Sequence, residues 1–143
     1  MEQGLLKDIR ENNDNTQQEI ADILNVKRGT YASWECGSDL IPTRKLYIYA
    51  NYYKKSIDYI MGLSEENTKI ICNKDIDLNL IGERLKIIRD KENLSQSKIA
   101  ESIGINQSTW WAYEKGKTLI TTASLISLSK QYKYSIDWIL ARI

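Results

Sequence analysis

The chain contains two copies of one sequence pattern. Shifting the sequence by 79 residues places residues 6–62 on residues 85–141 without a gap. The segment TQQEIA at 16–21 then falls on SQSKIA at 95–100. Self-similarity at one fixed offset indicates two copies of one fold. A chain of 143 residues would fit one domain by length alone, but the repeat predicts two domains of about 60 residues each, which is near the lower limit for a single hydrophobic core.

The repeat also predicts the domain bounds. Residues 1–62 form the first domain, residues 63–79 a connection, and residues 80–143 the second domain. Within the connection, the stretch KIIC at 69–72 is too apolar for a pure spacer, so we expect it to dock on a domain or to pair as a short strand. The chain has no apolar run that could span a bilayer and no signal peptide, which predicts a cytoplasmic protein without a membrane partner.

The second copy shows the organising motif most clearly. Ser95 is a good N-cap, and apolar residues then recur at helical spacing up to Ile103. Gly104 ends this helix because glycine adopts a left-handed conformation at no steric cost. Asn106 can cap a second helix that begins at Gln107. Two short helices joined by a tight glycine-containing turn make a helix-turn-helix.

The same pattern occurs in both copies of the repeat. It resembles the lambda-repressor and Cro-like family of DNA-binding domains, also called the xenobiotic-response-element type. The resemblance implies an all-α protein of two tandem five-helix domains that binds double-stranded DNA through the major groove. It implies a transcriptional regulator, most simply a repressor that occludes a promoter, encoded by a phage or other mobile element. In each domain the third helix is then the recognition helix.

Local signals predict the helix bounds. In the first copy Thr16 and Glu19 form a capping box, Asn25 takes the left-handed turn, and Thr43 caps the fourth helix. The expected helices of the first copy are 5–12, one after Thr16, 28–36, 44–53 and a short one after Ser56. Those of the second copy are 81–91, the two motif helices, 123–132 and one from Ile136.

The DNA-binding residues are assigned from the resemblance. It implies that Gln96, opening one helix, buttresses Gln107, opening the next, and that Gln107 reads an adenine edge, which suits the donor and acceptor of an amide. The competing interpretation is a pair of ordinary surface glutamines. The other predicted DNA-binding residues are Ser108, Thr109, Trp111, Ala112, Lys115 and Lys117 in the second copy, and Gln17, Lys27, Arg28, Thr30 and Ser33 in the first.

Several of these residues have competing interpretations. Trp111 is as compatible with packing against a partner or a neighbouring helix as with DNA contact, whereas Trp110 and Tyr113 are expected in the core. Lys115 and Lys117, like Arg44 and Lys45 of the first copy, either grip the DNA backbone or are solvated charges.

Two recurring ion pairs are also expected from the resemblance. Arg10 and Arg89 occupy equivalent positions in the first helix of each copy, and Glu35 and Glu114 occupy equivalent positions near the end of each recognition helix. Each arginine is expected to pair with the glutamate of its own copy. A bidentate pair of this kind pins two helices together.

The formal charge of the whole chain, +1, hides an asymmetry. Residues 1–62 carry eight Lys and Arg against nine Asp and Glu, a net charge of −1, whereas residues 80–143 carry ten against six, a net charge of +4. Because cationic side chains supply much of non-specific DNA affinity, the second copy is expected to be the stronger DNA head. If one chain binds DNA through both copies, the DNA site is expected to be asymmetric. If a homodimer binds DNA through the second copy alone, the site is expected to be a palindrome, and the first copy then serves partly in dimer assembly.

The composition excludes some chemistry. The chain has no histidine, so neither histidine acid–base catalysis nor a Cys/His zinc site is expected. Cys36 and Cys72 are expected to be thiols of a reducing compartment. We predict no enzymatic activity, cofactor, metal or small-molecule ligand.

The alternative function is a protein-binding module on the same fold, which would act like an antitoxin or inhibit a host antiviral enzyme. Surplus tyrosines around the fourth helix of the first copy, at 47, 49, 52 and 53, suggest a protein-binding surface, and the alternative is that they are scattered amphipathic surface residues.

Overall fold

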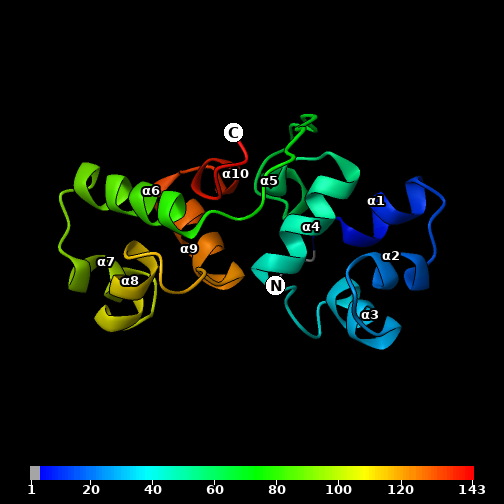
Figure 1. Ribbon diagram of the computed structural model, residues 1–143, viewed down its shortest axis with the longest axis horizontal. Helices are drawn as coiled ribbons and strands as arrows, with labels where there is room; N and C mark the ends of the chain where they lie inside the picture. Colours follow the sequence, from blue (N-terminus) through cyan, green and yellow to red (C-terminus); the bar gives the residue numbers. More distant parts are fainter. Residues whose placement is uncertain (1–3) are drawn as a thin grey trace. The chain divides into compact units, whose positions relative to one another are not determined.

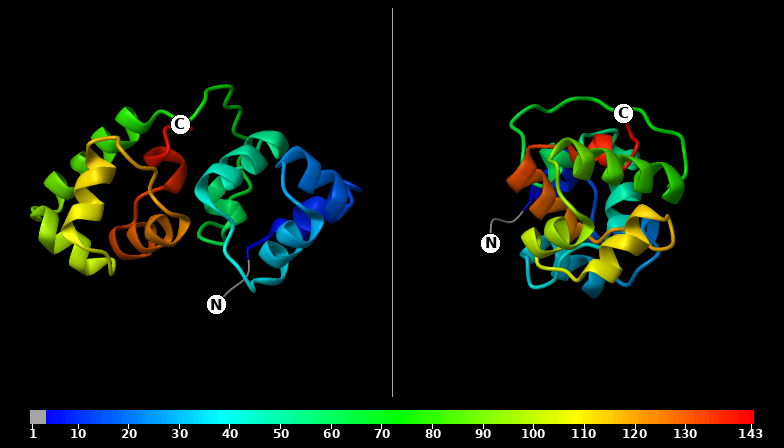
Figure 2. Two further views of the ribbon diagram at one scale, coloured as in Figure 1. Left: turned by 60° about the horizontal axis from the view of Figure 1, so that its bottom comes forward. Right: turned by 90° about the vertical axis from the view of Figure 1, so that its left-hand side faces the viewer.

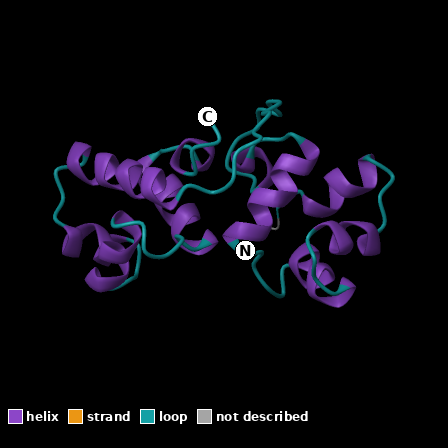
Figure 3. Ribbon diagram, in the orientation of Figure 1, coloured by secondary structure: helices purple, strands orange, loops and turns teal. Residues whose placement is uncertain are grey.

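The computed structural model describes residues 4–143 and divides the chain into two compact units, Met1–Asn73 and Lys74–Ile143. Over the described residues every regular element is a helix, and no strand is drawn (Figure 3). The predicted all-α class of two five-helix domains is therefore confirmed. Because the two units are separate bodies, each is described by itself.

Unit 1 contains five helices, coloured blue to green in Figure 1. They are α1 (Leu6–Asn12), α2 (Gln17–Ile23), α3 (Arg28–Cys36), α4 (Thr43–Tyr53) and α5 (Ile57–Ile60). Unit 2 repeats this order in green to red. Its helices are α6 (Leu78–Lys91), α7 (Gln96–Ser102), α8 (Gln107–Glu114), α9 (Thr122–Tyr132) and α10 (Ile136–Ile139).

Side-chain caps explain where most of these helices begin. Thr16 accepts a hydrogen bond from the Glu19 amide while the Glu19 side chain accepts one from the Thr16 amide, so the predicted capping box is confirmed. Ser95 and Asn106 cap α7 and α8 as expected, which satisfies amide groups that have no partner within the helix. Gly104 lies at φ 76°, which ends α7 with the left-handed turn that the sequence predicts.

The N-terminus of α4 differs from the prediction. Thr43 was expected to cap the helix, but it is the first helical residue and is buried, and Pro42 stands at the N-cap without a side-chain hydrogen bond. Proline fixes φ close to −65°, which suits the entry to a helix, but its side chain has no oxygen that could accept a hydrogen bond from the first-turn amides. In unit 2 the equivalent Thr121 does cap, since its hydroxyl accepts from the Ser124 amide and α9 begins at Thr122 rather than at 123.

Helix α6 begins three residues earlier than expected. The sequence analysis predicts a start at Ile81, whereas the helix starts at Leu78, because the Asp77 carboxylate accepts a hydrogen bond from the Leu80 amide at 3.1 Å. An aspartate at the N-cap both satisfies an amide and complements the helix dipole. The additional turn extends α6 into the segment predicted to be the connection.

The apolar part of the connection docks on unit 1. The Ile70 amide donates to the Lys54 carbonyl at 3.1 Å, and an isolated antiparallel bridge joins Lys55 to Lys69. The Ile70 side chain is buried, and the Tyr47 hydroxyl lies 3.3 Å from the Cys72 sulfur. The predicted docking is thus confirmed, and the pairing amounts to a single bridge rather than a strand.

The tyrosines of α4 do not form the surplus surface that the sequence suggests. Tyr49 and Tyr47 are buried, and the Tyr49 hydroxyl donates to the Leu6 carbonyl at 2.7 Å. Tyr53 donates to the side-chain oxygen of Asn15 at 2.7 Å. Only Tyr52, 48% exposed, remains largely at the surface. The expectation was wrong because each buried hydroxyl reaches an acceptor, which removes the cost of burying a polar tip.

In unit 2, α8 lies alongside α6 (Figure 2). The contact is close at Gly82, where an added Cβ would lie 2.3 Å from the carbonyl oxygen of Glu114 and 2.9 Å from that of Tyr113. Only a residue without a side chain fits against a backbone at this distance. Gly82 therefore lets α6 support the end of α8.

Candidate nucleic-acid interface

The first turn of α8 is locked by one side chain. The side-chain oxygen of Asn106, Oδ1, accepts three hydrogen bonds, from the Thr109 amide at 2.8 Å, the Thr109 hydroxyl at 2.8 Å and the Ser108 hydroxyl at 2.7 Å. Because both hydroxyl hydrogens point to Asn106, Ser108 and Thr109 present acceptor lone pairs in this state. A locked first turn holds the neighbouring Gln107 at a defined position.

The sides of α8 differ in burial. Trp110 and Tyr113 are buried in the core of unit 2, as predicted. Gln107, Ser108 and Trp111 are exposed, Thr109 and Ala112 are half-buried, and Lys115 and Lys117 are exposed just after the helix. The Lys117 ammonium lies 6.0 Å from the centre of the Trp111 ring. Trp111 is 41% exposed, so it offers part of its ring to a DNA or protein partner, and both interpretations of this residue stay predictions.

Glu114, the acid of α8, is turned away from this face. Its carboxylate accepts from Arg89 Nε at 2.9 Å, Arg89 Nη2 at 3.1 Å and Gln96 Nε2 at 3.1 Å, and also from Trp110 Nε1. Its side chain is 4% exposed. Burial opposes ionisation of Glu114, but hydrogen bonds from Arg89, Trp110 and Gln96 outweigh burial and hold its pKa below the ordinary value. The carboxylate therefore ties α6 and α7 to α8 and leaves the outer face without an exposed acid.

Unit 1 contains the equivalent ion pair. The Glu35 carboxylate accepts from Arg10 Nε at 2.6 Å and Nη2 at 3.0 Å, and from Gln17 Nε2 at 3.0 Å. Burial opposes ionisation of Glu35, and the hydrogen bond from Arg10 is the largest effect that lowers its pKa below the ordinary value. The structure thus contains both ion pairs that the sequence predicts. Tyr31 stands at the position of Trp110 and is buried like it.

Comparison with known proteins agrees with this geometry. A family model described as "Helix-turn-helix" matches residues 6–60, and a second, "Helix-turn-helix domain", matches residues 82–143. The chain is a tandem helix-turn-helix protein. The two matches confirm the predicted family for both halves of the chain.

Two individual proteins are similar to parts of the chain. An uncharacterized HTH-type transcriptional regulator of Bacillus subtilis, YobD, is 31% identical over 71 residues, and the match spans 50% of this chain and 63% of that relative. The chain thus aligns with less than two thirds of the relative's length. The restriction-modification controller protein C.AhdI from Aeromonas hydrophila has 24% sequence identity and a TM-score of 0.41, over 44% of this chain and 96% of that structure.

The two helix-turn-helix domains differ where the recognition helix begins. The hydrogen bond expected between Gln96 and Gln107 is not formed among the described residues, since the Gln96 amide group donates to Glu114 instead. In unit 1 the equivalent contact does exist, because Arg28 Nη1 donates to Gln17 Oε1 at 3.2 Å. Arginine is longer than glutamine and reaches the carbonyl of the supporting side chain. Gln107 is shorter, and its exposed amide has no partner of this kind.

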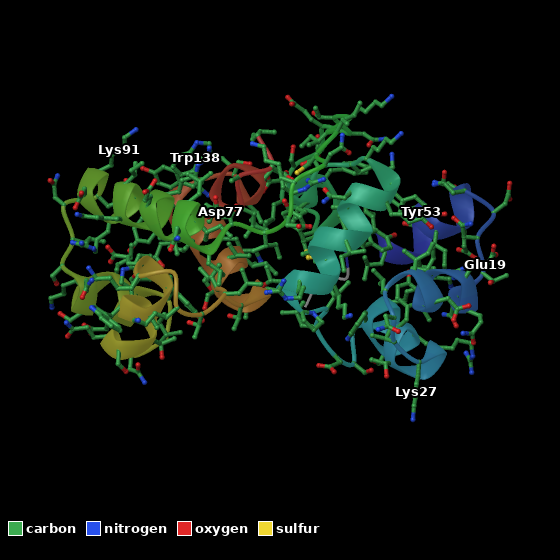
Figure 4. The ribbon with its side chains drawn as sticks, viewed as in Figure 1. Glu19, Lys27, Tyr53, Asp77, Lys91 and Trp138 are labelled. Atoms are coloured by element: carbon green, nitrogen blue, oxygen red, sulfur yellow. The ribbon has the colours of Figure 1, made fainter. Side chains whose placement is uncertain are left out.

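The remaining predicted residues of unit 1 surround the start of α3. Lys27, Arg28 and Thr30 are exposed, and Lys27 extends away from the ribbon in Figure 4. Lys27 gives no side-chain cap, as expected for a lysine at this position. Ser33 is half-buried, and its hydroxyl donates to the Thr30 carbonyl at 2.6 Å. The unit 1 helix therefore presents a cationic start but lacks the locked first turn of α8.

Some side chains have roles that sequence reasoning missed. Lys45 was expected either to grip DNA or to be solvated, but its ammonium group donates to the Leu24 carbonyl at 2.7 Å, at the end of α2. A lysine ammonium group near a helix C-terminus interacts favourably with the helix dipole. This preference could have predicted the contact with Leu24 if the approach of α4 to α2 had been known. In the same way Trp110 was assigned only to the core, although its indole N–H also donates to Glu114.

The described residues contain no cluster of metal-ligating side chains. Neither Cys36 nor Cys72, both of which the structure describes, is in a disulfide. Across residues 4–143 every helix is too short or too polar to cross a bilayer.

Proposed function

We propose that the protein is a sequence-specific regulator of transcription that binds double-stranded DNA, with unit 2 as its main DNA head. The observation that carries this proposal is the outer face of α8. It presents the Gln107 amide and the hydroxyls of Ser108 and Thr109 with no exposed carboxylate, and Lys115 and Lys117 follow directly after the helix. Side-chain hydrogen bonds hold the helix at its first turn and at Glu114. A helix of this size and polarity fits the major groove, where base edges offer hydrogen-bonding groups. The net charge of +4 over residues 80–143 supports the same assignment.

Unit 1 is proposed as a second, weaker head with a different base preference. Arg28 stands at the position of Gln107, and its guanidinium is oriented by Gln17, which is in turn held by Glu35. A guanidinium matches the two acceptors of guanine, whereas an amide matches adenine. If both heads bind one duplex, the preferred site is asymmetric, and if two chains use only unit 2, it is a palindrome.

We propose that the protein regulates transcription by repression. A regulator that covers a promoter needs no further chemistry than tight and specific binding. The resemblance to lambda-type repressors supports this role, and with it an origin in a phage or another mobile element. Selecting bound oligonucleotides from a random pool would reveal the operator and its symmetry in one experiment.

The proposal is tested by the salt dependence of binding to a random-sequence duplex. Because lysines that neutralise phosphates release counterions, log affinity is expected to fall steeply and linearly with log salt. Lys117→Glu is expected to lower the affinity several-fold at low salt and to reduce the slope by about 1 or more. Lys130→Glu, the same charge change on α9, is the matched control and is expected to have little effect. Weak binding that ignores salt would instead favour the protein-binding module.

Gln107→Ala tests the base contact. Loss of a bidentate amide contact is expected to cost about 1–3 kcal/mol, which is roughly 5- to 150-fold in affinity, and to relax one base position of the selected site. Gln131→Ala removes an exposed glutamine from α9 and serves as the control. An operator preference that is unchanged by Gln107→Ala would rule out this residue as a reader.

A further inference from the structure

Helix α8 carries a large aromatic side chain on its outer face. Trp111 is exposed and lies one helical turn after Gln107, so the two side chains share a side of the helix. The Lys117 ammonium lies 6.0 Å from the centre of the indole ring. The outer face of α8 therefore combines an amide that can contact a base edge with an apolar ring next to a cation.

Unit 1 lacks this combination. At the 79-residue offset, Trp111 corresponds to Ala32 and Lys117 to Ser38. Unit 1 nevertheless forms the same five helices in the same order. The helix-turn-helix fold therefore requires neither an indole nor an ammonium group at these positions. Packing within a unit does not explain them, and they belong to the surface of α8.

The charges around Trp111 favour a polyanion over an apolar protein surface. Lys115 and Lys117 are exposed directly after the helix, while the Glu114 carboxylate is turned inward and paired with Arg89. Covering two ammonium groups with an apolar partner would remove them from water without a counter-charge, which is costly. The phosphates of a duplex supply that charge. The partner that suits this face is therefore the DNA that the proposed function assigns to α8.

In the major groove only thymine, among the four bases, offers an apolar group. The edges of guanine, cytosine and adenine present donors and acceptors, whereas thymine also presents its C5-methyl group. An indole ring that faces this methyl group gains apolar burial, and one that faces the cytosine amino group covers a donor. We propose that Trp111 reads a pyrimidine C5-methyl group and so selects thymine in the part of the site that unit 2 contacts. This inference rests on the proposed binding of DNA by α8.

The spacing along α8 limits where this thymine lies. Gln107 and Trp111 are four residues apart, which is about 6 Å along a helix, and stacked base pairs are about 3.4 Å apart. The thymine is therefore expected within about two base pairs of the adenine that Gln107 is proposed to contact.

Deoxyuridine in place of thymidine tests the contact, because it removes the methyl group and keeps every hydrogen-bonding group of the base. Each thymine of the duplex selected by the wild-type chain is replaced in turn, and binding is measured for the wild type and for Trp111→Ala. At one thymine the wild-type chain is expected to lose about 4-fold in affinity, which is the effect of one buried methyl group. Trp111→Ala is expected to bind both duplexes equally. At the same position the wild-type chain is expected to bind 5-methylcytosine about 4-fold more tightly than cytosine.

The outcomes separate this inference from the function on which it rests. Wild-type binding that is insensitive to the methyl group at every thymine overturns the inference alone. A methyl effect that Trp111→Ala retains also overturns it, because another side chain would then make the contact. Failure to select any duplex rejects the proposed DNA binding and this inference with it. Tyr52→Ala removes an exposed aromatic side chain from α4 and is the matched control, expected to keep the full methyl effect. Thermal melting of both variants verifies that they are folded.

Discussion

Replacing Glu114 by glutamine is expected to destabilise unit 2 by about 3 kcal/mol, since breaking a buried ion pair leaves the remaining charge without compensation. The carboxylate accepts two hydrogen bonds from Arg89 and one each from Gln96 and Trp110. A glutamine amide offers one oxygen in place of two and turns an NH₂ group toward donors. The cost stays at the lower end for buried pairs because the Arg89 side chain is 18% exposed and can recruit water.

Hydrogen exchange of the full chain, followed separately in each unit, measures this effect. The slowest amides of α6, α7 and α8 are expected to exchange about 100-fold faster in the variant, while those of unit 1 stay unchanged. Glu101→Gln is the matched control. Its side chain is 78% exposed and only approaches Lys98 at 4.0 Å, so its loss is expected to cost less than about 0.5 kcal/mol. Equal effects of the two substitutions would contradict a structural role for Glu114.

The same variant has a distinct pH signature. The pKa of Glu114 lies below its ordinary value of 4.5 in the folded protein, so the folded state binds fewer protons than the unfolded state near that pH. The carboxylate thus contributes stability that is complete above pH 4.5 and is lost as the pH falls through the lowered pKa. In the glutamine variant nothing titrates at this position, and the acid-induced loss of stability in unit 2 is expected to be smaller.

Gly82→Ala is expected to be the second most damaging change, at about 1–3 kcal/mol or more, through overpacking. The new methyl group would lie 2.3 Å from the carbonyl oxygen of Glu114 and 2.9 Å from that of Tyr113. Both neighbours are backbone atoms, which cannot rotate aside, so α8 must move away from α6. The higher helix propensity of alanine returns about 1 kcal/mol and does not offset the clash. Because α8 carries the proposed base contacts, DNA affinity is expected to fall with stability.

Gly29→Ala provides a control of opposite sign. Gly29 also lies within a helix, α3, but an added Cβ there would meet nothing within 4 Å. Alanine at this position is therefore expected to stabilise unit 1 by about 0.5–1 kcal/mol, because it restricts the unfolded chain and favours the helix. Denaturation curves of the two variants compare the same chemical change in an open and in a closed site. Stabilisation by Gly82→Ala would show that α6 and α8 do not approach as closely as described.

Much of the architecture followed from short-range chemistry. The caps at Thr16, Ser95 and Asn106 and the left-handed glycine at 104 each predicted a helix boundary that the structure contains. These features depend on residues within a few positions of one another, whose geometry is fixed once a helix begins. The errors at Thr43 and Ile81 are also local, since Pro42 occupies the N-cap that was assigned to Thr43, and the Asp77 cap starts α6 three residues before Ile81.

Only part of the candidate site could be predicted from the sequence. The faces of α8 followed from its spacing, because side chains three and four residues apart share a side of a helix. The pairing of Gln96 with Gln107 did not hold, since the choice between Gln107 and Glu114 as partner depends on distances between three helices. For the same reason the ammonium group of Lys45 could not be placed on the Leu24 carbonyl before the approach of α4 to α2 was known.

The sequence by itself determined that the chain is a tandem pair of helix-turn-helix domains, that Trp110 and Tyr113 of α8 lie in the core, and that the positive charge lies in residues 80–143. Tertiary structure alone decided the close approach at Gly82, the four hydrogen bonds on Glu114 and the burial of the α4 tyrosines. Helix periodicity and capping are set by neighbours along the chain, whereas these contacts join residues far apart in sequence and depend on how whole helices pack.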